Sequence, residues 1–221
     1  MSRSVAATDP ELADTLHAGL RTLGLAVDPA RCERLLAFIA LLARWNRAYN
    51  LTAIDDPLAM VSRHLLDSLS IAPHLTGRRV LDLGSGAGLP GLPLAIWFPE
   101  HEFHLLDSNG KKVRFLFQAK VALGLGNVSV HHARAEAFRD PAGFDCITSR
   151  AFAPLADILR VSAHLLAPGG CLLAMKGRLG ADELVGVLTP YTVRSLIELR
   201  VPGIEVQRQL VRIERQEATV P

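Results

Sequence analysis

The sequence predicts an α/β fold in which a mostly parallel sheet follows an N-terminal helical extension and ends in an antiparallel hairpin. Three observations lead to this prediction. Apolar residues recur at helical spacing early in the chain, strand-like and helical segments then alternate, and two strand-like segments follow each other at the end. The length of 221 residues suits one domain with an extension better than two large domains. We expect the extension over residues 1–76 and the sheet domain over residues 77–221.

The N-terminal extension has the apolar periodicity of amphipathic helices. The residues that carry it are Leu12, Leu16, Leu20, Leu35, Phe38, Ile39 and Leu42. An aspartate directly before a proline occurs at Asp9, Asp28 and Asp56. Aspartate caps the free N–H groups of a first helical turn and proline fits that turn, so each pair marks a helix start. The extension is therefore predicted to contain three helices.

The remainder of the chain alternates between two kinds of segment. The predicted strands cover residues 80–83, 102–107, 127–131, 144–148 and 170–176. The predicted helices cover residues 92–98, 111–123 and 155–166. Alternation of this kind predicts a parallel sheet with helices on both faces. The last two strand-like segments, residues 191–201 and 205–213, are separated only by Pro202, Gly203 and Ile204 and predict the hairpin.

Composition excludes several classes of protein. With 49% hydrophobic and 21% charged residues, the chain is neither disordered nor collagen-like. It has no apolar run of about 20 residues and no apolar export signal, so we expect a cytoplasmic protein without a membrane partner. Cys32, Cys146 and Cys171 are odd in number and far apart. We expect reduced packing residues there, and no metal site.

The net charge of +2 hides a basic excess in the middle of the chain. Residues 107–178 contain ten basic and five acidic side chains. This excess fits nucleic acid binding and an ordinary solvated surface equally well. Three of its cations, Lys111, Lys112 and Arg114, begin a predicted helix, where the helix dipole disfavours positive charge, and this favours RNA contact weakly.

A glycine-rich loop over residues 82–95 follows the first predicted strand and leads into a helix. Gly84, Gly86 and Gly88 allow positive φ angles and let a ligand approach the backbone. A dinucleotide-binding fingerprint would need glycine at position 89, which is Leu89, and this argues against NAD. The residues of the loop that we expect to bind a cofactor are Gly84, Ser85, Gly86 and Leu89.

The second predicted strand ends in Asp107, 23 residues after Gly84. A carboxylate at about this offset accepts hydrogen bonds from ribose hydroxyls. The alternative is that Asp107 caps the next helix, although Ser108 or Asn109 would serve for that. Together, the loop and Asp107 indicate S-adenosylmethionine. A parallel sheet with a final antiparallel hairpin is the Rossmann-like architecture of class I methyltransferases.

Seven matching segments extend over nearly the whole chain. They are residues 45–52, 63–68, 82–95, 105–112, 135–136, 149–152 and 176–177. In this combination the chain resembles the bacterial small-subunit (16S) ribosomal RNA guanine-N7 methyltransferase G family, also called glucose-inhibited division protein B. Many methyltransferases share the glycine loop, whereas the Trp45-Asn46 and Arg63-His64 segments are far more specific.

The resemblance implies methyl transfer from S-adenosylmethionine to a guanine N7 in small-subunit ribosomal RNA. It implies that Gly84 and Leu89 line the cofactor, that Ala135 and Glu136 contact its adenosine end, and that Arg150 closes the site. The expected partner is small-subunit ribosomal RNA or an assembling small subunit, and we expect the enzyme to act as a monomer.

The chemistry of this reaction requires no general base, because guanine N7 has an in-plane lone pair and no proton to lose. Positioning of the reactants supplies most of the rate enhancement. Arg150 and Lys176 are the candidate catalytic residues. Arg150 is expected to meet the cofactor carboxylate or an RNA phosphate, with a salt bridge at a strand end as the alternative. Lys176 and Arg134, at strand ends, suit phosphate contact and solvated surface equally.

Two other functions remain open from the residues. A non-catalytic RNA-binding or ribosome assembly factor could keep the fold, although the complete loop with Asp107 argues against lost activity. An NAD-dependent oxidoreductase is opposed by the glycine spacing. Of the eight histidines, we expect a site role only for His64.

Overall fold

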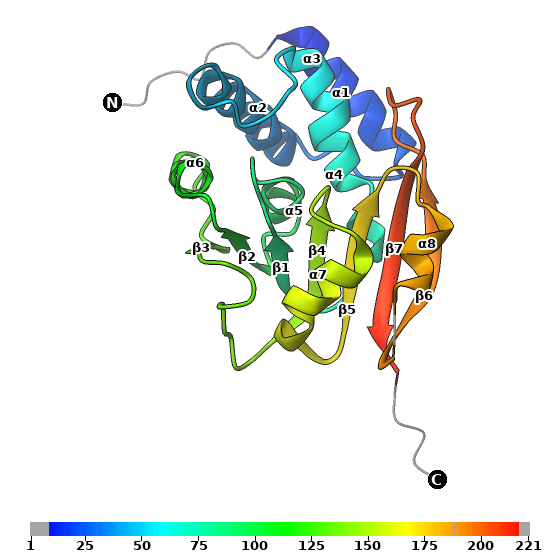
Figure 1. Ribbon diagram of the computed structural model, residues 1–221. Helices are drawn as coiled ribbons and strands as arrows, with labels where there is room; N and C mark the ends of the chain where they lie inside the picture. Colours follow the sequence, from blue (N-terminus) through cyan, green and yellow to red (C-terminus); the bar gives the residue numbers. More distant parts are fainter. Residues whose placement is uncertain (1–8, 188, 217–221) are drawn as a thin grey trace.

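The computed structural model describes residues 9–187 and 189–216, which contain a seven-stranded sheet in the order β3-β2-β1-β4-β5-β7-β6 (Figure 1). The first five strands of this order pair in parallel, and β7 pairs antiparallel with both β5 and β6. The strands are β1 (Arg79–Leu83), β2 (Glu102–Asp107), β3 (Val128–His132), β4 (Phe144–Arg150), β5 (Leu166–Lys176), β6 (Tyr191–Leu199) and β7 (Arg208–Arg215). The predicted parallel sheet with a final antiparallel hairpin is confirmed.

The helical segments follow the predicted order, with two short additions, η2 before β1 and α8 near the C-terminal end. They are α1 (Pro10–Thr22), α2 (Pro29–Tyr49), α3 (Pro57–Met60), η1 (Val61–Leu66), α4 (Asp67–Leu69), η2 (Ala72–His74), α5 (Gly91–Trp97), α6 (Gly110–Ala122), α7 (Leu155–Ser162), η3 (Ala163–Leu165) and α8 (Ala181–Val185). Asp9, Asp28 and Asp56 accept hydrogen bonds from N–H groups of the first turns that they precede, as predicted.

The third predicted helix is interrupted by a π-helical turn. Residues 57–69 form α3, the π turn η1 and α4 without a break. A π turn inserts one extra residue per turn and often occurs at functional sites. Sequence periodicity did not indicate it, because the same apolar residues fit an α-helix. The turn contains His64.

The start of β5 also differs from its prediction. The strand begins at Leu166 rather than at residue 170, and α7 ends at Ser162 before the short turn η3. Pro168 and Gly169 interrupt the strand-like pattern before residue 170, so the sequence does not indicate the first part of the strand. The register shift between Phe144 and Cys146 in the pairing of β4 with β5 accommodates the irregular strand.

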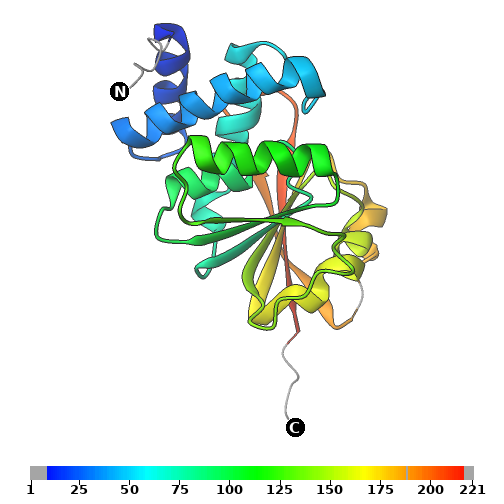
Figure 2. The ribbon, with the colours of Figure 1, turned by 90° about the vertical axis from the view of Figure 1, so that its left-hand side faces the viewer.

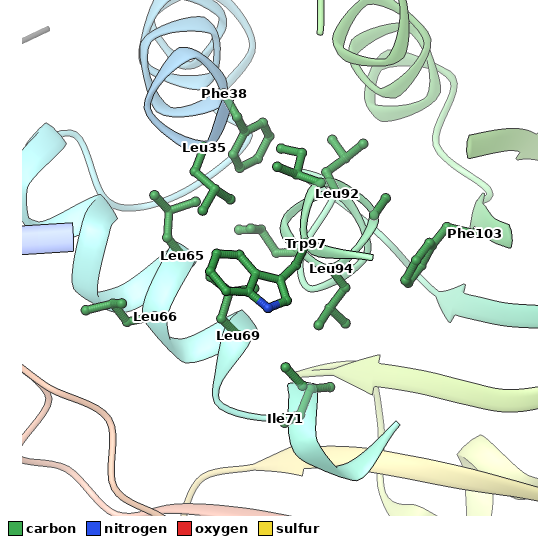
Figure 3. Packing of buried hydrophobic residues seen from close by; sticks show 14 of the residues in the cluster. Leu35, Phe38, Leu65, Leu66, Leu69, Ile71, Leu92, Leu94, Trp97 and Phe103 are labelled. Carbon is green, nitrogen blue, oxygen red and sulfur yellow. The ribbon is translucent and has the colours of Figure 1, made fainter. Parts of the chain in front are cut away.

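Two hydrophobic cores lie on opposite faces of the sheet. The larger includes residues of α1, α2, η1, α5 and α6, and the smaller includes residues of α7 and η3. In Figure 3, Trp97 of α5 lies among Leu65, Leu69 and Leu94, so the N-terminal helices and the sheet domain share a core. The division into an extension over residues 1–76 and a sheet domain over residues 77–221 stays a prediction.

The shared core fixes the N-terminal helices over one face of the sheet. Figure 2 shows α6 between α2 and the strands. Phe115 of α6 contacts Phe38 and Trp45 of α2, with ring centroids 6.4 and 5.7 Å apart. The C-terminal end of α2 is therefore held close to the N-terminal half of α6.

The three cysteines, Cys32, Cys146 and Cys171, are free and buried, as expected for packing residues. In the described part of the chain, no helix is long and apolar enough to cross a membrane. Within residues 9–187 and 189–216, no cluster of three or more His, Cys, Asp or Glu side chains is arranged to hold a metal ion.

Candidate active site

Two adjoining pockets open at the carboxyl ends of the parallel strands. Their volumes are about 520 and 480 Å³, within the range of small-molecule sites. We call the larger the His64 pocket and the smaller the Asp107 pocket. They share a wall formed by Gly84, Lys112, Arg150 and Ala151. Ligands of open α/β sheets bind at this edge, so the two pockets form the candidate site.

Asp107 lies at the floor of its pocket and is 7% exposed. One carboxylate oxygen accepts the N–H of Gly86 at 2.9 Å, and the other accepts the N–H of Asn109 at 2.8 Å. Asn109 caps α6 by accepting the N–H groups of Lys111 and Lys112. The capping role considered for Asp107 therefore belongs to Asn109, and the Asp107 carboxylate faces the pocket.

The glycine loop has the backbone that its sequence predicts. Gly84, Gly86 and Gly88 have φ angles of +68°, +57° and +81°. A side chain at Gly84 would collide with Phe152, and one at Gly88 would collide with Leu92. A Cβ at Gly86 would have no atom closer than 3.8 Å. The absence of a side chain thus lets Phe152 pack against Gly84 and Leu92 pack against Gly88. At Gly86 it leaves space for a ligand to approach.

The other predicted cofactor residues lie around the same wall. Ser85 and Leu89 are buried and line the His64 pocket. Ala135, which is buried, and Glu136, which is exposed, line the Asp107 pocket. The structure thus brings the predicted cofactor residues, from Gly84 to Glu136, together around the two adjoining pockets, although these two residues are 52 positions apart in the sequence.

Asp82 is a structural residue of the site that sequence reasoning missed. It is fully buried at the end of β1 and accepts the N–H of Gly91 at 3.0 Å and the hydroxyl of Thr148 at 3.2 Å. Burial raises the pKa of this carboxyl to about 6. Asp82 fixes the start of α5 relative to β1 and β4. Its position as the first residue of the segment 82–95 was the available signal.

His64 is 4% exposed and lines the larger pocket. Its Nε2 lies 2.9 Å from the hydroxyl of Thr52. Burial, followed by the positive charge of Arg150, lowers the pKa of His64 to about 4. The imidazole is therefore neutral near pH 7.

The segment after α2 forms one side of the His64 pocket. Asn46 accepts the N–H of Thr52 at 2.8 Å and donates to the carboxylate of Asp55 at 2.6 Å. Leu51, Thr52, Ala53 and Ile54 line the pocket. Asn46 therefore holds a loop against the site, which gives the Trp45-Asn46 segment a structural role.

Asp67 joins two arginines at the mouth of the His64 pocket. It is 2% exposed, and its two oxygens lie 3.0 Å from Nη1 of Arg150 and 3.1 Å from Nε of Arg208. Arg150 also donates to the carbonyl of Arg63 at 3.1 Å. The salt bridge considered as the alternative for Arg150 is thus formed, while Arg150 still lines both pockets.

Sequence reasoning did not assign Asp67 or Arg208 to the site. Asp67 lay in the matched segment over residues 63–68, where its charge in an apolar helix was a usable signal. Arg208 is 141 residues away from Asp67 and has no distinguishing sequence pattern. Only the tertiary structure, which places the start of β7 against α4, brings the two together.

The remaining basic candidates differ in their surroundings. Lys176 lines the His64 pocket, but its amino group donates to the carbonyl of Ala153 at 2.5 Å and pairs with Glu183 at 2.8 Å. Arg134 is exposed and lines the Asp107 pocket, and Lys112 lines both pockets. Lys176 is therefore already paired with an acid, whereas Arg134 is exposed and the half-buried Lys112 lies in the wall that the two pockets share.

The comparisons with known proteins agree with this geometry. The family model for GidB, rRNA small subunit methyltransferase G, matches residues 31–211. The chain is 52% identical over 203 residues to the ribosomal RNA small subunit methyltransferase G of Nitrosococcus oceani, covering 92% of this chain and 95% of that protein. It is 55% identical over 202 residues to the protein of the same name from Chromohalobacter salexigens, covering 90% and 96%.

A solved structure supports the fold separately. The SAM-dependent methyltransferase from Aquifex aeolicus superposes with a TM-score of 0.57 at 18% identity, covering 74% of this chain and 96% of that chain. At this identity the likeness concerns the class I methyltransferase fold alone. The family model matches most of the chain, and about half of the residues are identical to those of the two named relatives over at least 90% of this chain. The chain therefore belongs to the rRNA small subunit methyltransferase G family.

Proposed function

We propose that the protein transfers the methyl group of S-adenosylmethionine to the N7 of a guanine in small-subunit (16S) ribosomal RNA. S-adenosylmethionine-dependent methylation of small-subunit ribosomal RNA is the activity of the family to which the chain belongs. The observation that carries the proposal is the pair of pockets that meet at Gly84. One suits a nucleoside and the other has room for a second reactant.

The residues of the Asp107 pocket suit the adenosine part of the cofactor. Each Asp107 oxygen accepts one backbone N–H and keeps a second lone pair, so the carboxylate can still accept ribose hydroxyls. Ala135 and Glu136 are proposed to contact the base end, and Gly84, Ser85, Gly86 and Leu89 to line the remainder. The open space at Gly86 supports this assignment.

When bound, the cofactor supplies an electrophilic methyl group on a sulfonium. The protein's task is to hold guanine N7 in line with that methyl, and alignment can contribute roughly 7–11 kcal/mol. His64, which is neutral near pH 7, adds no positive charge beside a guanine that becomes cationic on N7 methylation. We assign the neutral His64 and its partner Thr52 to shaping the acceptor side of the pocket.

Arg150 and Lys176 are the proposed catalytic residues. Arg150 lies in the wall between the pockets, where it can contact the cofactor carboxylate or a phosphate while Asp67 holds it. A guanidinium suits both anions because of its planar fork of donors. Lys176, paired with Glu183, is proposed to contact an RNA phosphate at the pocket edge.

The oligomeric state, the cellular location and the form of the RNA substrate are part of the same proposal. We propose that the protein acts as a monomer in the cytoplasm on small-subunit ribosomal RNA or on an assembling small subunit. The second candidate function, a non-catalytic assembly factor that retains the fold, is disfavoured by the free carboxylate face of Asp107 in an open pocket.

The test is transfer of radiolabelled methyl from S-adenosylmethionine to 16S ribosomal RNA and small subunits from cells that lack this protein. Chemical cleavage specific for N7-methylguanine then locates the product. We expect one methylated guanine, and strongly reduced incorporation with Asp107→Ala at low cofactor concentration. Absence of transfer by the unaltered protein would support the assembly factor, and methylation at another atom would contradict the N7 assignment.

A further inference from the structure

A basic and aromatic surface lies next to the two pockets. Helix α6 has four basic residues and no acidic residue among its 13 positions. The basic residues are Lys111, Lys112, Arg114 and Lys120. Lys111 and Arg114 are exposed and make no salt bridge with a described residue. Since cations near a helix N-terminus are repelled by the helix dipole, their position gives the fold no stability.

The last turn of α2 contributes exposed groups of the same kind. Arg47 is exposed, and Tyr49 is 40% exposed. The Tyr49 ring stacks on Trp45 with a centroid distance of 5.0 Å and an interplanar angle of 26°. Trp45 in turn contacts Phe115 of α6 at 5.7 Å. The tyrosine is thus held by a partly buried aromatic while its outer side remains open.

Both helix ends lead directly to the site. The chain that leaves α2 lines the His64 pocket over residues 51–54, and Lys112 in the first turn of α6 lines both pockets. The acidic residues nearest to these groups in the sequence are Asp55, Asp56 and Asp107. Asp55 and Asp56 accept hydrogen bonds from Asn46 and from an N–H group of α3, and Asp107 accepts the N–H groups of Gly86 and Asn109. On this surface, Arg47, Lys111 and Arg114 form no salt bridge with a described residue.

We propose that the α2–α6 surface, formed by Arg47, Tyr49, Lys111 and Arg114, binds the single-stranded RNA that flanks the target guanine. This inference rests on the proposed function. Single-stranded RNA is the occupant that fits, because its phosphates match the cations and an unpaired base can stack on an open aromatic ring. A duplex offers no unstacked base to Tyr49.

The first test compares two charge-matched double variants. Lys111→Gln with Arg114→Gln removes two charges from the surface, and Arg160→Gln with Arg194→Gln removes two from α7 and β6, where both arginines form exposed ion pairs. Binding to naked 16S ribosomal RNA is measured as a function of salt. With a slope of about −0.7 per phosphate contact, the surface variant should flatten the dependence by roughly 1.4. The control should match the unaltered protein.

The second test addresses Tyr49. Tyr49→Ala should weaken RNA binding by about 5- to 150-fold, the range for loss of one base–aromatic stack, and Tyr49→Phe should restore it. Affinity for S-adenosylmethionine, measured by calorimetry, should not change in any of these variants. A purely structural role of Tyr49 would instead change the unfolding midpoint.

The outcomes separate this inference from the proposed function. Failure of the unaltered protein to methylate small-subunit RNA would refute the function. Normal methylation, together with salt slopes and RNA affinities in the surface variants equal to those of the control, would refute the α2–α6 surface alone. A defect with small subunits but none with naked RNA would assign the surface to a ribosomal protein and would also overturn the inference.

Discussion

The Asp107 pocket and the His64 pocket share the Gly84 wall, but the chain builds them in different ways. In the Asp107 pocket, one carboxylate accepts backbone N–H groups from the glycine loop and from the start of α6. The His64 pocket depends on hydrogen bonds and ion pairs between side chains. The residues that form these bonds and pairs are Thr52, His64, Asp67, Arg150 and Arg208.

This difference predicts different responses to mutation. Changes in the Asp107 pocket should weaken cofactor binding more than they lower the free energy of unfolding, because they remove ligand contacts and, within the protein, only two backbone hydrogen bonds of one loop region. Changes in the His64 pocket should lower stability as well as turnover, because they leave the partly buried charges of Arg150 and Arg208 without a partner. Four experiments test this contrast.

The largest effect is expected for Asp67→Ala. Removing one partner of a buried ion pair costs about 3–5 kcal/mol. The Asp67 carboxylate is buried, but the two arginine side chains are 22% and 27% exposed, so we expect a loss of about 3 kcal/mol, at the lower end of this range. Urea unfolding should show this loss in the free energy of unfolding. Turnover should fall even in the fraction that folds, because Arg150 would lose its position.

The matched control for this change is Asp67→Asn, which keeps the size and one hydrogen-bond acceptor. It should lose less stability than Asp67→Ala. If the alanine variant unfolds within about 0.5 kcal/mol of the unaltered protein, a difference typical of surface substitutions, the cluster has no structural role.

The next largest effect is expected for Gly86→Val. A β-branched residue is a steric outlier at the φ of +57°, and its side chain would fill the space left for the ligand. Cofactor affinity should fall by more than it does with Asp107→Ala. Calorimetric titration with S-adenosylmethionine measures this loss.

Gly124→Val separates strain from ligand contact. Gly124 has a similar φ of +64° and no place in either pocket, and a Cβ at this position would have no described atom within 4 Å. Because valine is strained at both φ angles, both variants should lose stability, whereas only Gly86→Val should weaken cofactor binding. Equal cofactor affinities in the two variants would contradict the assignment of the loop.

A smaller effect is expected for Asp107→Ala. Loss of hydrogen bonds between the carboxylate and ribose should weaken cofactor binding by about 1.5–3 kcal/mol, the range for a charged acceptor. The dissociation constant from calorimetry gives this value directly. Asp107→Asn, which retains an acceptor, should weaken binding less, and an unchanged constant in the alanine variant would remove Asp107 from the site.

The smallest effect concerns the pH dependence of stability at His64. The pKa of His64 is about 4 in the folded protein, whereas an ordinary histidine has a pKa of 6.5. Between these two pH values, His64 therefore binds more protons in the unfolded chain than in the folded protein. The contribution of the neutral imidazole is complete above pH 6.5 and is lost progressively as the pH falls to 4. From pH 6.5 to 5.5 the loss should be about 1 kcal/mol.

The control is His64→Gln, measured over the same pH range. Asp82, whose raised pKa acts in the opposite direction by favouring the folded state as pH falls, is present in both proteins and cancels in the comparison. The unaltered protein should therefore lose more stability than His64→Gln on acidification. Parallel curves would show that His64 does not titrate with the predicted shift.

The sequence by itself determined the sheet, its final hairpin, the starts of the three N-terminal helices and the glycine loop with Asp107. These features depend on local rules: residue periodicity, capping by aspartate before proline, and the positive φ angles that glycine permits. Each rule acts within a few residues, so it can be recognised in a single segment.

Only the tertiary structure decided the π turn at His64, the burial of Asp82 and the joining of Arg150 and Arg208 by Asp67. It also brought Tyr49 and the basic start of α6 to the mouth of the same pockets through the contact of Trp45 with Phe115. Burial and ion pairing depend on which surfaces meet when helices pack on a sheet. Asp67 and Arg208 are 141 positions apart, and a contact over such a distance in sequence produces no periodic pattern of residues that could predict it.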